Sequence, residues 1–412
     1  MFRRKKNDDS KGDDGPGADL ENRLVEWRRH IHRRPELSYE EKETTAYVAS
    51  ELREMGLEPR EFKLGTGLWC DVPAAANAGG GGSSGSDGVD TDGVDTDIVV
   101  ALRADIDALP MSEESGLDFA SEVEGVSHTC GHDGHTAMLL GVAQLMMDDP
   151  PPRRVRLIFQ PAEETMPGGA KDCVEEGVLD GVDRIIGLHC DPKRQTGEVG
   201  ITDGAITSSN AKVDLHVYSD GGHTARPHET QDTVYALAQI VTGLTGVVDR
   251  RFDPRSGTVL TFATADAGEG APNVIPESAE VVGTLRSADR DVWAAAEEVV
   301  RDAVEELAAP FGVGAKVEYT QGVPPVVNDS ECAELATHAV RSVLGEEGVG
   351  VAPQSSGGDD FGWYTEEIPG VYLRLGVWDG QSEQSDLHHP GFVLDESALP
   401  HGARVLDAFA RL

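Results

Sequence analysis

The sequence predicts an α/β protein with two domains. The larger has a mainly parallel sheet flanked by helices, and a ferredoxin-like α+β domain is inserted into it. The first observation is the length: 412 residues exceed what one hydrophobic core usually holds. The second is that β-rich apolar runs alternate with helical segments in the first half of the chain. The third is a β-α-β-β-α-β order of segments in residues 208–320.

The first elements are a pair of helices and a strand. Residues 20–56 place apolar side chains at helical spacing, and Gly56 ends the second helix. A strand-like segment follows at 68–73. Residues 74–97 are rich in Gly, Ser and Asp and lack aromatic residues, so they predict a disordered surface loop. The polar segment 1–19 has a basic cluster without the apolar stretch of a secretory signal, which predicts a disordered tail.

Three apolar runs then end in polar residues. Helical segments at 135–149 and 168–181 separate them, which indicates βαβ units and a parallel sheet. Functional crevices of such sheets lie beyond the carboxyl ends of the strands. The runs are 98–107, ending at Asp105 and Asp107; 155–164, ending at Glu163 and Glu164; and 184–190, ending at His189 and Cys190. The polar residues are therefore expected at one edge.

From about residue 208 the order of predicted strands and helices changes. Segments 210–220, 257–268, 278–289 and 315–322 read as strands, and 233–251 and 291–311 as helices. This is the ferredoxin-like order. The chain then returns with a helix at 329–345 and a strand at 370–378. We therefore predict a larger domain made of 20–207 and 321–412, interrupted by a lid or dimerisation domain at 208–320.

The composition excludes some partners. The formal net charge is −39, from 74 acidic and 35 basic side chains, so nucleic acid is not an expected partner. The acidic residues are spread along the chain, which favours adaptation to high salt over an ordinary acidic enzyme. No apolar run approaches the length of a membrane span. Five irregularly spaced cysteines do not make a disulfide framework, and we expect reduced thiols in the cytoplasm.

The segment 128–136, His-Thr-Cys-Gly-His-Asp-Gly-His-Thr, is the strongest local motif. Cys130 and His132 are two residues apart and point to the same side of an extended backbone. Taken alone, they are also compatible with a packed cysteine and a helix-capping histidine. Together with Glu164, His189 and a histidine of Asp-Leu-His-His-Pro (386–390), they form the ligand set of a transition metal such as zinc.

Glu163 and Glu164 are adjacent after a buried-type strand. Neighbouring side chains of an extended backbone point in opposite directions. One carboxylate can therefore bind a metal while the other acts as a general base. The alternative is a solvated acidic run, which is common in so acidic a chain.

These residues occur in motifs that resemble, in order, the M20 metallopeptidase family. The resemblance is closest to its amidohydrolase branch of hippurate hydrolases, aminoacylases and indole-acetyl-amino-acid hydrolases, and it runs from about residue 20 to the C-terminus. The motifs are RADIDALP (103–110), HTCGHDGHT (128–136), QPAEE (160–164), GLH (187–189), GGHTARPH (221–228), APNVIP (271–276), GTLRS (283–287) and LHHPGF (387–392).

The resemblance implies a dinuclear metal site. Two divalent ions (Zn, Mn, Co or Ni) are expected, with the Cys130 thiolate placed to bridge them and Glu163 as the base. The branch pattern selects His388 rather than His389. It makes Asp105 and Asp107 supports of the ligands, and leaves His128 and His135 to loop and helix-start roles and Cys190 to packing. The implied ligands are Cys130, His132, Glu164, His189 and His388.

The resemblance also assigns roles in the inserted domain. His223 would polarise the substrate carbonyl, in many relatives by reaching into the partner subunit's site, so a homodimer is expected. Asn273 and Arg286 would hold the substrate's α-carboxylate. Without the resemblance, exposed residues of these types mostly just contact solvent. Two features depart from the family pattern and leave the acyl-group preference open: Thr165, Met166 and Pro167 where relatives usually have a glycine-led turn, and Asp359 where they often have Glu.

The function implied is hydrolysis of the amide bond of N-acyl amino acids by a metal-activated water. The small-molecule product pair would be a carboxylate and a free amino acid. A metallocarboxypeptidase that acts on short peptides is the nearest alternative. A catalytically silent metal-binding scaffold is an alternative from another class, and the intact Glu163 argues against it.

Overall fold

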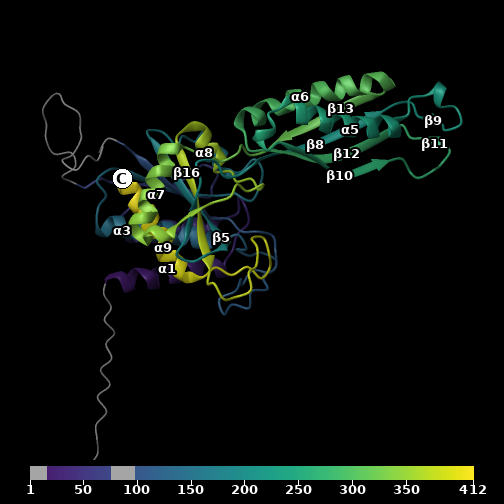
Figure 1. Ribbon diagram of the computed structural model, residues 1–412. Helices are drawn as coiled ribbons and strands as arrows, with labels where there is room; N and C mark the ends of the chain where they lie inside the picture. Colours follow the sequence, from purple (N-terminus) through teal and green to yellow (C-terminus); the bar gives the residue numbers. More distant parts are fainter. Residues whose placement is uncertain (1–15, 76–97) are drawn as a thin grey trace, which may run out of the picture.

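The computed structural model describes residues 16–75 and 98–412 (Figure 1). The loop predicted at 74–97 and the tail predicted at 1–19 lie almost entirely outside these residues. The predicted helix pair is present as α1 (Pro16–Arg33) and α2 (Lys42–Glu54). Helix α1 begins within the predicted tail. Leu20, Leu24, Trp27 and Ile31 follow its helical repeat and are buried.

The larger domain is built on an eight-stranded sheet. Its central strands β4, β3, β5 and β16 are parallel, as predicted, whereas β2 and β6 join them in antiparallel fashion. The order across the sheet is β1 (Arg60–Glu61), β2 (Leu68–Val72), β4 (Val155–Gln160), β3 (Val100–Asp105), β5 (Arg184–Gln195), β16 (Gly370–Trp378), β6 (Val199–Ile201) and β15 (Val349–Val351).

Helices cover both faces of this sheet. On one face α3 (His132–Asp148) packs against α1 and α9 (Leu399–Arg411), and α9 also packs against α7 (Ser330–Leu344). On the other lie the short helices α4 (Gly169–Glu175) and α8 (Gly362–Glu367). Val100, Leu102 and Ala104 of β3 belong to the core on the first face and Ala101 to the core on the second. Burial on both faces is the reason that the central strands are continuous apolar runs.

The smaller domain has the predicted ferredoxin-like topology. Its antiparallel sheet has the order β10 (Val259–Ala267), β12 (Ser278–Ser287), β8 (Ser209–Tyr218), β13 (Gly314–Gln321). Helices α5 (Thr233–Arg251) and α6 (Arg290–Ala308) pack against it and enclose a separate core. A two-stranded ribbon of β9 (Gly222–His223) and β11 (Val274–Ile275) lies at the end of this domain that points away from the large sheet (Figure 1).

The chain enters and leaves the smaller domain at one place. The backbone N–H of Gly322 donates to the carbonyl of Asn210 at 3.0 Å, and the N–H of Val323 donates to Oδ1 of Asn210 at 3.2 Å. The two crossings are therefore hydrogen-bonded to each other. Two short strands, β7 (Gly204–Ala205) and β14 (Val327–Asn328), pair just before and just after them. Among the described helices none is both long and apolar enough to cross a membrane.

Candidate active site and metal centre

The polar residues that follow the central strands gather at one edge of the large sheet. Asp105 ends β3, Glu163 and Glu164 follow β4, and His189 lies within β5. Cys130 and His132 reach this edge from the start of α3, where Gly131 turns the chain with a φ of 90°. A positive φ is easily adopted by glycine. A Cβ at Gly131 would also approach Sγ of Cys190 to 3.0 Å. This turn lets the motif approach β5 closely.

Cys130 and His189 face each other with both side chains buried. The Cys130 Sγ lies 3.3 Å from Nε2 of His189. The Nδ1 of His189 donates to the backbone carbonyl of Cys190 at 2.8 Å, so its Nε2, which faces the Cys130 thiol, is the acceptor nitrogen. Burial and the neighbouring His135 lower the pKa of His189 well below its usual range. A neutral imidazole with its other nitrogen engaged is the form that binds a metal.

His132 is similarly oriented by Asp107. Its Nδ1 lies 2.9 Å from the carbonyl oxygen of Asp107 and 3.2 Å from its carboxylate. Its Nε2 is buried and makes no hydrogen bond in the described part of the chain. Carboxylate oxygens of Asp105, Glu164 and Glu163 lie 3.7, 3.8 and 4.0 Å from this nitrogen. A buried ring nitrogen that lacks a hydrogen-bond partner and is surrounded by carboxylates is the environment expected around a cation.

Glu164 and His388 complete the group. Nε2 of His388 lies 3.2 Å from Oε1 of Glu164. The backbone of His388 has a φ of 58° and its N–H donates to the carbonyl of Thr129 at 2.9 Å, which ties it to the Cys130 motif. His389 instead accepts a hydrogen bond from the N–H of Gly391 through its own Nδ1.

The predicted ligands form overlapping groups that could hold metal ions. Within each group the ligand atoms lie within 4.8 Å of one another. Cys130 and Glu164 each belong to two of these groups, and His132 belongs to three. The groups that contain predicted ligands are Cys130, His132 and His189; Cys130, Glu164 and His388; His132, Glu163 and Glu164; and His132 with Asp105 and His135.

Burial and an excess of negative charge together shift the pKa values of Cys130, His132 and Glu163 at this edge. Burial and the carboxylates of Glu164 and Glu163 raise the pKa of the Cys130 thiol well above its usual range. Burial opposes the charged form of His132, but Asp105 and Asp107 outweigh it and raise its pKa to about 10. Burial and Asp359 raise the pKa of Glu163 well above its usual range. Bound divalent cations would offset this charge, so the donor set fits the metals that the sequence predicts.

Arg103 is a charged residue of this edge that the sequence interpretation did not assign. It is fully buried and donates to Oδ2 of Asp105 at 2.6 Å, to Oδ1 of Asp360 at 2.8 Å and to Oε1 of Gln160 at 2.7 Å. Arg103 is the first residue of the motif RADIDALP (103–110), and this position could have identified it as a residue of the site. The guanidinium provides a fixed positive charge beneath the carboxylates.

His128 and His135 are both buried, and His135 lies in the first turn of α3, the helix-start position expected for it. Nδ1 of His135 donates to Asp105 at 2.6 Å, and its Nε2 accepts from the backbone N–H of Cys190 at 2.9 Å. Both ring nitrogens are thus engaged, and His135 positions Asp105. Burial lowers the pKa of His128 to about 4. All five cysteines are free and buried, in agreement with the absence of a predicted disulfide framework.

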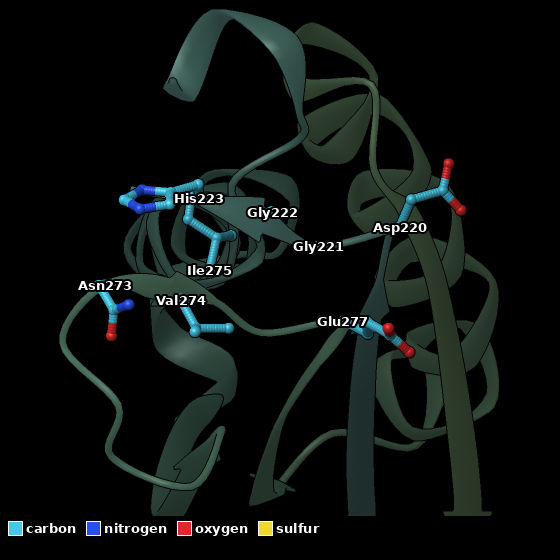
Figure 2. Close-up of a pocket in the computed structure, with 8 residues that line it drawn as sticks. All are labelled: Asp220, Gly221, Gly222, His223, Asn273, Val274, Ile275 and Glu277. Carbon is cyan, nitrogen blue, oxygen red and sulfur yellow. The ribbon is translucent and has the colours of Figure 1, made fainter. Parts of the chain in front are cut away.

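The structure does not bring His223 and Asn273 to this edge. Both are exposed and lie on and beside the β9–β11 ribbon, at the far end of the smaller domain (Figure 1). They line an open pocket of about 350 Å³ together with Asp220 and Glu277. Figure 2 shows His223 and Asn273 on one side of the pocket and the two acidic side chains on the other. Arg286 lies elsewhere, near the domain junction, where it donates to the carbonyl of Ser356 at 2.7 Å.

Known proteins are similar to this chain over most of its length. A Rhodococcus jostii protein named "Putative glutamate--cysteine ligase 2-3" is 52% identical over 392 residues, which cover 95% of this chain and 47% of that protein. The chain thus spans about half the length of this relative. The N-acetyl-L-cysteine deacetylase of Bacillus subtilis is 37% identical over 92% of this chain and 85% of its own length.

A solved structure is also similar. It is that of a Bacillus subtilis protein described as a dinuclear metal binding peptidase from the M20 family, and it has a TM-score of 0.79 and 33% identity. It covers 95% of this chain and 98% of its own. The model of peptidase family M20/M25/M40 matches residues 101–412, which include every strand end and ligand candidate described above. The chain belongs to peptidase family M20/M25/M40.

Proposed function

We propose that this protein is a metal-dependent amidohydrolase that cleaves N-acyl amino acids into a carboxylate and a free amino acid. The observation that carries the proposal is the position of Glu163. Its carboxylate lies beside a buried set of thiol, imidazole and carboxylate donors, 4.0 Å from the unpartnered Nε2 of His132. A metal site with an adjacent free carboxylate is the arrangement used for hydrolysis.

The proposed ligands of two divalent ions are Cys130, His132, Glu164, His189 and His388, and zinc or manganese are the expected metals. When bound, such ions polarise the scissile carbonyl and lower the pKa of water. Asp107 orients His132, and Asp105 is held in turn by Arg103 and His135. Glu163 takes a proton from the attacking water and returns it to the leaving amine.

We place His223 in the active site of a second subunit. Its location supports this, because β9, the strand that carries it, lies at the end of the inserted domain that points away from the large sheet (Figure 1). The surface that we propose for contact between the two subunits is formed by β10, an edge strand of its sheet, and the neighbouring helix α5. Val234, Tyr235 and Val259 are about half exposed there. A second copy would pair with this edge and cover the apolar side chains.

The proposed substrates carry a free α-carboxylate, which Arg286 and Asn273 would bind once the domains and subunits close. N-acetyl-L-cysteine is the first compound to test, because a relative that aligns over most of both chains is named for its deacetylation. The five free cysteines favour a reducing compartment, and we propose a cytoplasmic enzyme adapted to high salt.

The test is amino-acid release by the purified protein with added Zn²⁺, Mn²⁺ or Co²⁺. The panel holds N-acetyl-L-cysteine, N-acetyl and N-benzoyl derivatives of other amino acids, and dipeptides. We expect metal-dependent release from N-acyl amino acids that exceeds release from dipeptides. The reverse preference would make the protein a carboxypeptidase. Release from no compound, with metal bound, would contradict the proposal.

A further inference from the structure

The backbone just before the carboxylate pair has a conformation that alanine disfavours. Ala162 is buried and has a φ of 56°, in the left-handed region that residues with a Cβ rarely enter. It immediately precedes Glu163 and Glu164. Rotation at this residue would move both carboxylates. Strain of this kind persists only where surrounding contacts impose it.

Glu41 supplies such a contact. It lies at the start of α2, far from the site in sequence, and is fully buried. Its Oε1 accepts a hydrogen bond of 2.8 Å from the backbone N–H of Ala162. Its Oε2 makes no hydrogen bond in the described part of the chain. Burying a carboxyl group costs free energy unless hydrogen bonds offset the loss of hydration. Because Glu41 makes only one side-chain hydrogen bond in the described part of the chain, to Ala162, that contact needs an explanation.

Glu41 is itself fixed in place. Its backbone carbonyl accepts hydrogen bonds from both the N–H and the hydroxyl of Thr45, and that hydroxyl accepts from the N–H of Gly67 at 2.8 Å. The start of α2 is therefore tied to the end of the sheet that carries the site. The carboxyl group has little freedom to follow Ala162 if the latter moves.

The same segment also supports the other end of the carboxylate pair. The hydroxyl of Ser38 donates to Oδ2 of Asp107 at 2.7 Å, and this oxygen accepts the N–H of Glu164 at 2.9 Å. The carbonyl of Ala162 accepts from the N–H of Gly169 at 2.8 Å. Hydrogen bonds thus hold the segment from Ala162 to Glu164 at three backbone groups. Glu41 accepts one of these bonds directly, and Ser38 supports Asp107, which accepts another.

We infer that Glu41 is a positioning residue: its carboxyl holds Ala162 in the left-handed conformation and so sets the direction of Glu163 and Glu164. The inference rests on the proposed function, in which these two carboxylates are the base and a ligand. It is not a catalytic role, since Glu41 touches neither proposed ligands nor reacting atoms. Small displacements of a catalytic group reduce the rate strongly.

Two conservative variants distinguish positioning of Ala162 by the Glu41 oxygen from an effect of the negative charge of Glu41. Glu41→Gln keeps an acceptor oxygen in the same place but removes the charge. Glu41→Asp keeps the charge but withdraws the oxygen by one methylene. Burial, with a smaller contribution from Asp107, raises the pKa of Glu41 to about 7, so a neutral side chain is compatible with this position.

The experiment measures kcat and KM for both variants at saturating metal, with metal content from elemental analysis. We expect Glu41→Gln to stay within about threefold of the wild type. We expect Glu41→Asp to lose about a hundredfold in kcat with KM nearly unchanged. A further substitution, Ala162→Gly, should restore at least tenfold in the Glu41→Asp background, because glycine adopts the left-handed conformation without help. Equal losses in the two single variants, or full activity of Glu41→Asp, would overturn the inference.

Crystal structures of the same two variants give a readout that does not depend on turnover. Ala162 should keep its positive φ in Glu41→Gln and leave it in Glu41→Asp, with both carboxylates displaced. An unchanged Ala162 in Glu41→Asp would refute the inference even if no substrate were found. A wild-type enzyme inactive on the whole panel would instead refute the proposed function, so the two failures are distinguishable.

Discussion

At the scale of single residues, Glu163 is the side chain whose replacement best separates binding from chemistry. Glu163→Gln keeps the shape of the side chain and leaves the five proposed ligands in place. We expect metal content to stay at the wild-type level and kcat to fall by about 10²–10⁴-fold, as is usual on loss of a general base. Elemental analysis and steady-state kinetics on the same preparation measure both quantities.

The control for this variant is Glu114→Gln, a carboxylate change in the larger domain at a residue that the site does not use. It should leave both metal content and kcat unchanged. A Glu163→Gln enzyme with near wild-type turnover would show that another group acts as the base.

His32 makes stability depend on pH away from the proposed ligands. It lies between Asp133 and Glu113, with its ring nitrogens 2.8 and 3.1 Å from their carboxylates. Burial lowers the pKa of His32, but the two carboxylates outweigh it and raise the pKa to about 9. The group thus binds its proton more tightly in the folded chain than in the unfolded one, where its pKa is about 6.5.

The stabilisation by His32 should be complete below about pH 6.5 and disappear as the pH rises toward 9. It amounts to roughly 3 kcal/mol. Denaturant unfolding between pH 6 and 10 should show a steeper decline for the wild type than for His32→Gln. Parallel curves for the two proteins would exclude this linkage.

The sequence pointed to most of the proposed ligands because Glu164 and His189 end apolar runs and Cys130 and His132 lie in one dense motif. His388 was selected by the resemblance to the M20 family. Because Glu163 and Glu164 are adjacent in the sequence, one could be predicted to bind a metal and the other to act as a general base. Sequence reasoning could not locate Glu41 or Arg103. The importance of Glu41 comes from one hydrogen bond to a residue far along the chain. Arg103 lies in β3, and two of its partners, Gln160 and Asp360, come from other segments of the chain. Such contacts exist only in the folded chain.

At the scale of elements, local patterns predicted the long helices and the buried strands. They did not predict that β2 runs antiparallel to β4 or that β6 runs antiparallel to β16, because strand direction depends on the path of the connections. The short strand β15 and the pairing of β9 with β11 were also not predicted. Runs of two or three residues carry no periodic signal. The amphipathic C-terminal helix α9 was missed, although its buried face is regular.

Helix α3 should be sensitive to any added side chain at Gly141. An ideal Cβ there would lie 2.6 Å from Cδ2 of Leu24 in α1 and 3.3 Å from Cβ of Ala403 in α9. Gly246 in α5 is a matched control, because a Cβ there would meet only the Arg250 side chain, at 3.6 Å. Gly246→Ala should raise the free energy of unfolding by about 1 kcal/mol through helix propensity.

Gly141→Ala has the same gain in propensity but crowds two helices that pack closely. We expect it to lower the free energy of unfolding by about 1–2 kcal/mol. Chemical denaturation of the two variants beside the wild type measures the difference. An equal increase in both would show that α1 and α9 move apart without cost.

At the scale of the whole molecule, the location of His223 predicts that activity belongs to a dimer. Glu163→Gln and His223→Ala should each be inactive alone. In a mixed dimer, the His223→Ala subunit keeps its own Glu163 and receives His223 from its partner. Equal mixing with subunit exchange should therefore restore about a quarter of the wild-type activity.

The control is a mixture of two preparations that carry the same substitution, which should stay inactive. A monomeric wild type by light scattering, or no recovery on mixing despite exchange, would contradict the assignment of His223 to the second subunit.

The net charge of −39 predicts a dependence on salt. At low ionic strength the acidic surface repels itself, and this repulsion is screened within about 3 Å at molar salt. We expect the midpoint of thermal unfolding to rise by several degrees between low and molar KCl. A midpoint that is constant or falls over this range would refute the proposed adaptation to salt.

The hydrogen-bonded pair of crossings at Asn210 and Val323 has a consequence for how this architecture can change over time. Because the two chain segments that connect the domains lie side by side, the smaller domain is an insertion joined to the larger domain at one place. Its removal or exchange would leave a gap that a short turn can close, without cutting a strand of the large sheet. The site at the edge of the large sheet and the smaller domain can therefore diverge separately, so that the smaller domain changes while the residues of that edge stay the same.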